Sequence, residues 1–185
     1  MKCVVVAVLV LCLLTGCSKK SGIEPALELR NSVINARTCS FIATITADYG
    51  DEIFSFKMSC VSDESGKISF RVMEPDTIEN ISGYIDTDGG ELVFDDQVLV
   101  FPLLTDEYLS PISVPWLLIR TVRGGFIVSG GGAGEYYKLQ IDDSFNEERL
   151  SADIWLDEKN FPVYCDFLWD NKRILSAEIT DFTIK

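Results

Sequence analysis

The amino-acid sequence predicts an α+β domain in which a strongly curved antiparallel sheet wraps two helices. Apolar and polar residues alternate with a period of two in most of the chain after residue 38, a pattern typical of half-buried strands. Two segments, near residues 24–37 and 114–124, interrupt this alternation with apolar residues at helical spacing. About nine strands and two helices therefore have to bury their apolar sides in one core.

The first helix is predicted over residues 24–37. Pro25 fits the first turn, where its missing N–H costs no hydrogen bond. The helix is amphipathic, and its apolar residues at helical spacing are Ala26, Leu29, Val33 and Ala36.

The next segment can be laid out as a hairpin that turns at Gly50 and Asp51. A one-residue slip would turn every apolar side chain to the other face, so the alternation fixes the register. The opposed pairs are Ala47 with Phe54, Ile45 with Phe56, Ala43 with Met58, and Phe41 with Cys60. Residues 67–72 repeat the alternation and add Ile68, Phe70 and Val72 to the same apolar face.

The second helix is predicted where residues 113–124 break the strand pattern. Ser113 can cap it, Pro115 can enter its first turn, and Gly124 stops it. Its apolar residues, Trp116 among them, cover nearly the whole girth, so we expect it to be buried against the concave face of the sheet.

Further strands are expected on both sides of this helix. Between residues 81 and 101 they turn at residues 88–90 and 95–96, and after residue 125 they are separated by glycine and asparagine turns. The sequence GGGAGE, residues 130–135, is interpreted as a flexible connection, with a lid or ligand-entry role as the alternative.

Residue types that support catalysis or metal binding are scarce. The chain has no histidine, which excludes Ser-His-Asp and Cys-His nucleophiles and the commonest transition-metal ligand sets. The carboxylate pairs at 95–96, 142–143 and 147–148 fall at predicted turns, and we interpret them as solvated. Residues 86–91, DTDGGE, lack the ligand pattern of a calcium loop. We therefore expect no catalytic residue, no metal and no cofactor.

The N-terminus predicts export and lipid anchoring. Residues 1–16 contain one charge and an apolar run that has the length of a signal-peptide core and is too short to span a bilayer. The border LTGC, Leu14 to Cys17, resembles the lipobox of bacterial lipoproteins, in which a signal peptidase cuts before an acylated cysteine. An ordinary signal peptide with an incidental thiol is the alternative.

This border divides the chain into a signal peptide (1–16), a lipidated cysteine with its tether (17–22) and one domain (23–185). We expect the acyl chains on Cys17 to hold the domain on the outer face of the plasma membrane, or at the outer membrane if the cell has one.

Charge and cysteine content narrow the partners further. Without Lys2 the chain has 15 basic and 29 acidic residues, a formal charge of −14, which argues against nucleic acid. Three cysteines remain in the domain, at positions 39, 60 and 165, so at most one internal disulfide can form. Cys39 and Cys60 are diagonal neighbours in the predicted register, which favours free thiols over a bridge.

The apolar face of the sheet is the remaining candidate site. It is either ordinary core or the lining of a hydrophobic hollow that takes a ligand. The candidate residues are Phe41, Ile45, Phe54, Phe56, Met58, Phe70, Val72 and Trp116.

The chain resembles the lipoprotein-carrier superfamily in its lipobox, its N-terminal helix and its alternating strands. Three stretches also resemble that superfamily: FRVMEPDTI, GYIDTDGGELVF and ADIWLDEKNFPVYCDFLWDNKRILSAEITDFTI. That superfamily includes sigma-factor regulatory proteins and clostridial germination lipoproteins. The resemblance implies a half-open β-barrel whose hydrophobic hollow is lidded by helices.

Two functions follow from the resemblance. The first is a membrane-anchored, non-catalytic protein that binds a lipid or acyl chain in the hollow. The alternative is an interaction module that binds or activates a secreted cell-envelope enzyme. A hydrolase is the third possibility, and turnover of a glycan that a carboxylate substitution abolishes would support it.

Overall fold

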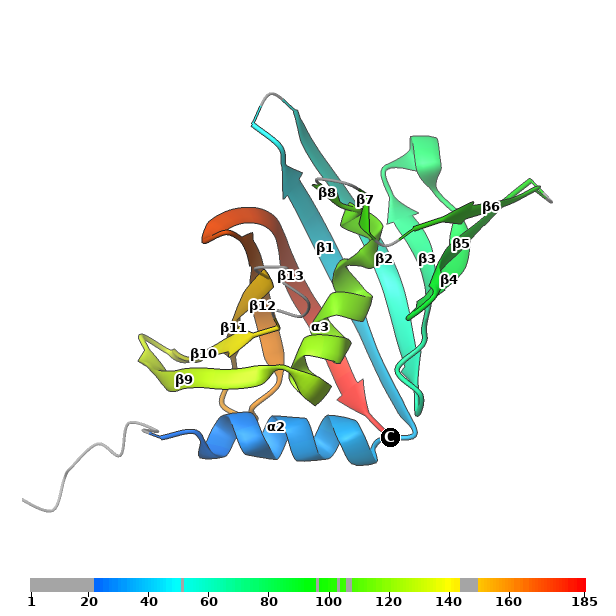
Figure 1. Ribbon diagram of the computed structural model, residues 1–185. Coiled ribbons are helices and arrows are strands. Elements are labelled where there is room, and N and C mark those ends of the chain that lie inside the picture. Colours follow the sequence, from blue (N-terminus) through cyan, green and yellow to red (C-terminus); the bar gives the residue numbers. More distant parts are fainter. Residues whose placement is uncertain (1–21, 51, 96, 103, 106–107, 144–149) are drawn as a thin grey trace, which may run out of the picture.

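One antiparallel sheet of eleven strands dominates the computed structural model, which describes residues 22–50, 52–95, 97–102, 104–105, 108–143 and 150–185 (Figure 1). The strand order is β6-β5-β4-β3-β2-β1-β13-β12-β11-β10-β9. The strands are β1 (Thr38–Asp48), β2 (Ile53–Asp63), β3 (Ile68–Glu74), β4 (Ser82–Asp86), β5 (Gly89–Phe94), β6 (Gln97–Phe101), β9 (Phe126–Ala133), β10 (Tyr136–Asp142), β11 (Leu150–Leu156), β12 (Pro162–Trp169) and β13 (Lys172–Ile184).

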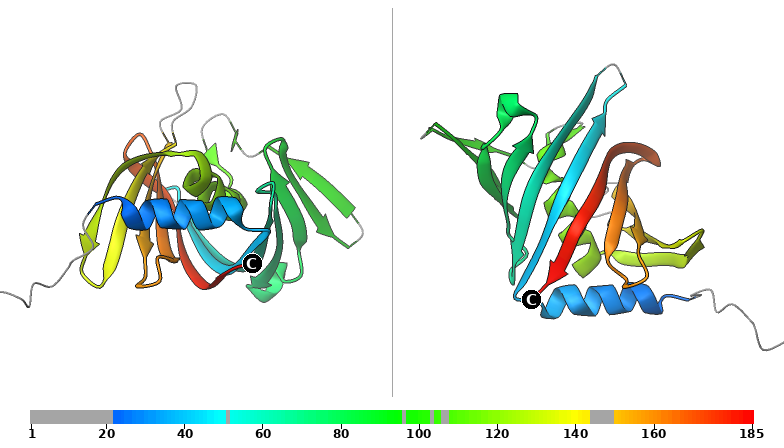
Figure 2. Two further views of the ribbon diagram at one scale, coloured as in Figure 1. Left: turned by 90° about the horizontal axis from the view of Figure 1, so that it is seen from below. Right: turned by 180° about the vertical axis from the view of Figure 1, so that it is seen from behind.

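The sheet is strongly curved and does not close, because β6 and β9 are its two ends. Seen along the strands, it forms a trough (Figure 2). The predicted antiparallel α+β class is therefore confirmed, with more strands than the nine expected. A separate pair, β7 (Leu104–Thr105) and β8 (Tyr108–Leu109), was not anticipated.

Two helices accompany the trough. Helix α2 (Glu24–Asn35) crosses one of its ends, and α3 (Val114–Gly124) lies inside it, on the concave face (Figures 1 and 2). Both begin and end within two residues of the predicted bounds. Ser113 does not cap α3 with its side chain; its hydroxyl instead donates to the Ser110 carbonyl, 2.6 Å away. Short 3₁₀ turns occupy Asp76–Ile78 and Pro111–Ser113.

The predicted register of the first hairpin is confirmed. Ala47 pairs with Phe54, Ile45 with Phe56, Ala43 with Met58 and Phe41 with Cys60. Burial alternates residue by residue along β1, as a sheet with one covered face requires.

The interpretation of residues 130–135 as a flexible connection was wrong for its first four residues. Gly130 to Ala133 belong to β9 and pair with β10, and the turn occurs only at Gly134. A glycine is required at position 130 because a Cβ there would lie 1.8 Å from the Tyr137 hydroxyl.

The three cysteines of the domain are free and buried, as the diagonal register indicated. Burial raises the pKa of the Cys60 and Cys165 thiols, so both stay protonated and unreactive at neutral pH. They act as small core residues.

Candidate interaction surface

The concave face of the trough contains most of the residues predicted to line a hollow. Six of the eight are buried, each at most 7% exposed, and they share one hydrophobic core with α3. These six are Phe41, Ile45, Met58, Phe70, Val72 and Trp116. Their role as a ligand-binding lining stays a prediction, whereas their packing as core is observed.

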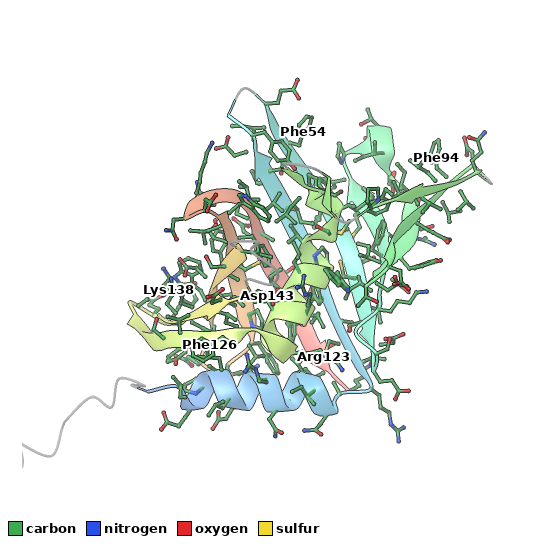
Figure 3. All side chains as sticks on the ribbon, viewed as in Figure 1. Phe54, Phe94, Arg123, Phe126, Lys138 and Asp143 are labelled. Atoms are coloured by element: carbon green, nitrogen blue, oxygen red, sulfur yellow. The ribbon has the colours of Figure 1, made fainter. Side chains whose placement is uncertain are left out.

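Phe54 and Phe56 differ from the other six. Phe56 is only partly buried, and Phe54 is 47% exposed near the tip of the first hairpin. The Phe54 ring packs on Tyr49 at a centroid distance of 6.4 Å, and the Tyr49 hydroxyl donates to the Leu109 carbonyl. Phe54 therefore lies at the rim of the trough rather than in its centre (Figure 3).

Polar contacts fix α3 in the trough at its C-terminal end. The Arg30 guanidinium of α2 donates to the carbonyls of Val122, at 2.7 Å, and Gly125. Carbonyls at a helix C-terminus have no partner within the helix, so a cation there satisfies them and opposes the helix dipole. Arg123 donates in turn to the Glu64 carbonyl of the β2–β3 turn.

Asp143 also ties α3 to the sheet, which corrects its interpretation as a solvated turn residue. Its carboxylate lies 3.6 Å from Arg120 and accepts a hydrogen bond from the Thr121 hydroxyl, and only 10% of its side chain is exposed. Burial raises the pKa of Asp143, and the charge of Arg120 and the Thr121 hydrogen bond partly oppose that rise. Asp96 and the carboxylate pair at 147–148 lie outside the described residues.

The other end of the sheet contrasts with this packed half. We call β4, β5 and β6 the wing, because they turn away from α3 (Figure 1). On β6, Val98, Leu99 and Val100 are 60%, 61% and 70% exposed. Val93 and Phe94 of β5 are exposed as well, so the hairpin is apolar on both faces.

The wing hairpin is built from ordinary turn and pairing chemistry. Asp86 accepts a hydrogen bond from the Asp88 amide at the β4–β5 turn, where Gly89 has a φ of 141°. Gly90 lies under the Phe101 ring, and a Cβ there would come within 2.2 Å of that ring. Residues 86–91 therefore form a hairpin turn, as expected from their mismatch to a calcium loop.

The convex face has a groove of about 640 Å³ over β10–β13, with Trp155 and Tyr164 in edge contact. Tyr164 donates to Asp166, which Arg173 approaches to 3.9 Å, and Lys138 pairs with Asp153 at 2.7 Å. Burial raises the pKa of Asp166; the Tyr164 hydrogen bond and Arg173 lower it, and Asp153 adds to the rise.

The described residues contain neither a metal-ligand cluster nor a membrane-spanning helix. Within them, no group of three or more histidine, cysteine, aspartate or glutamate side chains is placed to hold a metal ion. No helix in the same part of the chain is long and apolar enough to cross a membrane. Cys17 and the other residues up to 21 lie outside the described residues, so lipidation stays a prediction.

Comparison with known proteins gives similarity of fold. No protein-family model and no curated protein matches the chain. One similar chain occurs in the structure of the complex between the CwlD amidase and the GerS lipoprotein of Clostridioides difficile. It has a TM-score of 0.48 at 9% identity, and 90% of this chain and 98% of that chain are covered.

Two other similar structures are named for lipoprotein sorting and for the LolA superfamily. A putative outer-membrane lipoprotein-sorting protein domain from Vibrio parahaemolyticus has a TM-score of 0.45 at 9% identity, covering 89% and 92% of the two chains. A LolA superfamily protein from Nitrosomonas europaea has a TM-score of 0.44 at 8% identity, and 86% of this chain and 93% of that chain are covered. The resemblance stated from the sequence is thus confirmed as a resemblance. All three TM-scores are below 0.5, so the likeness is one of fold.

The sequence predicted strands in the wing, but it did not predict that the wing is exposed. The available signal is the run Val98-Leu99-Val100, three consecutive apolar residues in a strand. Successive strand residues point to opposite faces, so a strand with one covered face cannot bury such a run. The run therefore indicates a strand whose second face needs a partner.

Proposed function

We propose that this chain is a membrane-anchored, non-catalytic interaction module that binds a protein of the cell envelope along β6. The observation that supports this best is the exposure of Val98, Leu99 and Val100 on an end strand of the sheet. The covered concave face supplies the stability of the domain, and the wing supplies the contact surface.

The end strand lacks the features that keep sheet edges from pairing. Monomeric proteins protect such strands with charged residues, prolines, bulges or a covering segment. The five residues of β6 include no charge and no proline, and in the part of the chain that the structure describes no strand pairs with the outer edge of β6. An uncharged apolar edge of this kind is a template for a further strand.

The partner that fits is an extended segment of another protein. Adding a strand to a sheet edge satisfies the free backbone groups, and alternate side chains then lie against the two faces of the hairpin. Val98 and Val100 lie on one face, and Leu99 with Phe94 on the other. The partner segment therefore needs apolar residues at successive positions.

Charge around the hairpin favours a basic rim on the partner. The turns and strands next to β6 contain Asp86, Asp88, Glu91 and Asp95, and the whole chain has a net charge of −13. Complementary charge at the rim of an interface speeds association and selects among partners.

Membrane anchoring through Cys17 belongs to the same proposal. The domain begins six residues after this cysteine, so a lipid on Cys17 keeps the domain at the membrane surface. A secreted envelope enzyme or a regulator that binds the wing would then be held at the membrane.

A lipid or acyl ligand is the second candidate. It is favoured by the continuation of the concave apolar lining beyond α3: Ile85, Leu92 and Leu99 share one face across β4, β5 and β6. Extraction of the purified domain followed by mass spectrometry tests this function. Stoichiometric lipid would support the carrier over the module.

A photo-reactive phenylalanine analogue at single positions tests the interaction module in the producing cell. With the analogue at Val98 or Val100, we expect one adduct of constant mass; with it at Ser69, an exposed polar residue on the convex face of β3, we expect none. Each variant is first shown to keep the thermal unfolding midpoint of the unmodified protein.

Two results would contradict the proposal. Equal adducts from positions 69 and 98 would mean that the wing has no preferred partner. An adduct of twice the mass of the chain would mean that β6 pairs with a second copy rather than with another protein.

A further inference from the structure

A second exposed apolar surface lies at the other end of the molecule, beside the start of the domain. We call it the α2–β9 surface. Its side chains come from the flank of α2 and from the end strand β9, and all are 45–73% exposed: Ile23, Leu27, Ile34, Phe126 and Val128.

The three α2 residues form one stripe. At 100° per residue, positions 23, 27 and 34 fall within about 40° of one another around the helix axis. Ile23 precedes the helix, but its carbonyl accepts the Leu27 amide at 3.0 Å, so it continues the same spiral.

Hydrogen bonds at two points, Gly22 and Arg30, hold the first part of this stripe alongside β9. Arg30, which lies on the same flank, donates to the Gly125 carbonyl next to Phe126. At the other end, the Tyr137 hydroxyl donates to the Gly22 carbonyl and touches Gly130 of β9. The first half of β9 therefore runs beside the first half of α2, with Phe126 next to the helix (Figures 1 and 3).

From this arrangement we propose that the α2–β9 surface rests on the lipid bilayer. The inference rests on the proposed anchoring at Cys17, which lies six residues before Ile23. Six extended residues span at most about 20 Å, so a lipid on Cys17 holds the near end of this surface close to the membrane.

Charge placement fits this occupant. Arg30, the charged residue within the stripe, is turned inward onto two carbonyls. Glu28 lies on the opposite flank, where it accepts a hydrogen bond from Asn160 at 2.6 Å. The tether contributes Lys19 and Lys20, cations that can pair with lipid phosphates. Two carboxylates border the surface: Glu24 lies beside Gly22 at the start of α2, and Asp142 is the cross-strand partner of Phe126. The helical stripe itself contains no carboxylate between Leu27 and Ile34, because Glu28 points to the other flank.

The orientation that follows links the two apolar surfaces. The wing hairpin lies at the end of the molecule opposite the start of α2 (Figure 1). A domain that lies on the bilayer through α2 and β9 presents β6 away from the lipid, where a partner segment can reach it.

The test uses the full, lipid-bearing chain on phosphatidylcholine vesicles. A polarity-sensitive fluorophore is attached to Phe126→Cys or Leu27→Cys, with Val98→Cys on the wing as the matched control. The three buried cysteines do not compete for the label under native conditions. We expect a blue-shifted emission, and quenching by nitroxide-bearing lipid at least about threefold stronger at positions 27 and 126 than at 98.

The outcomes separate the anchor from the orientation. If the chain fails to float with the vesicles in a density gradient, the anchor is refuted and the inference falls with it. If the chain floats but position 126 is quenched no more than position 98, the anchor stands and the orientation is refuted. A label at 126 that is shielded from water yet not quenched by lipid would mean a protein contact, which also overturns the inference.

Discussion

The two halves of the sheet on either side of β1 are both built from antiparallel strands, but they differ in how far their apolar residues are buried. On the side of β13 to β10, the apolar face is covered by α3 and, at the end of the trough, by α2, and residues such as Phe167 and Ile154 are fully buried. On the side of β4 to β6, the sheet turns away from the helices and leaves Leu99 of the same face in solvent.

This difference shows that alternation alone does not decide which apolar residues are core. A strand residue is buried only if another element covers its face, and in this chain one helix is too short to cover eleven strands. The covered half provides stability, and the uncovered wing is free for binding.

The largest expected effect is on the free energy of unfolding. It comes from making the same Leu→Ala substitution in the covered core and in the wing. Leu118→Ala, at a fully buried position in α3, should lower the free energy of unfolding by about 3 kcal/mol, because it removes transfer energy and leaves a cavity. Leu99→Ala on the wing should change it by less than about 0.5 kcal/mol. Urea unfolding of both variants measures this, and equal losses would mean that the wing is part of the core.

An intermediate effect is expected from the link between the helices. Arg30→Met keeps the aliphatic stem but leaves the Val122 and Gly125 carbonyls without their donor, so we expect a loss of about 2 kcal/mol. Arg37→Met, at an exposed position just beyond α2, is the matched control and should be close to neutral. If the two variants unfold at the same denaturant concentration, Arg30 does not fasten α3.

A smaller, pH-dependent effect is expected on the convex side of the covered half. Because the folded-state pKa of Asp166 is raised, the folded protein takes up a proton at a higher pH than the unfolded chain does. As the pH falls through the folded pKa towards 3.8, the stability of the wild type should rise relative to Asp166→Asn.

Parallel thermal melts between pH 7 and about 4 measure this difference, with Asp88→Asn at an exposed turn as the control. If the wild type instead loses stability relative to Asp166→Asn as the pH falls, the raised pKa of Asp166 is contradicted.

The sequence predicted the parts of the fold that local patterns determine. The first hairpin's register was correct because Phe41, Ile45 and Met58 must share a face. The burial of α3 was correct because its apolar residues, among them Leu117, Leu118 and Ile119, cover nearly the whole girth of the helix.

Other parts depend on contacts that no local pattern contains. Gly130 to Ala133 were interpreted as a connection because glycine usually marks turns, yet their backbone pairs with β10 and Tyr137 fills the space above Gly130. Asp143 resembles a solvated turn residue until α3 brings Arg120 and Thr121 to it. The wing is exposed because α3 covers only part of the concave face. Which part it covers depends on how the helix packs on the assembled sheet.

Amide hydrogen exchange at β6 tests most directly whether the wing is a surface kept free for a partner. It is measured on the purified domain, residues 22–185, and on the full chain in membranes of its own cell. We predict fast exchange at residues 97–101 in the purified domain and exchange slower by about tenfold or more in the membranes, with β12 unchanged between the two. Equal exchange at residues 97–101 in both preparations would contradict the proposed function.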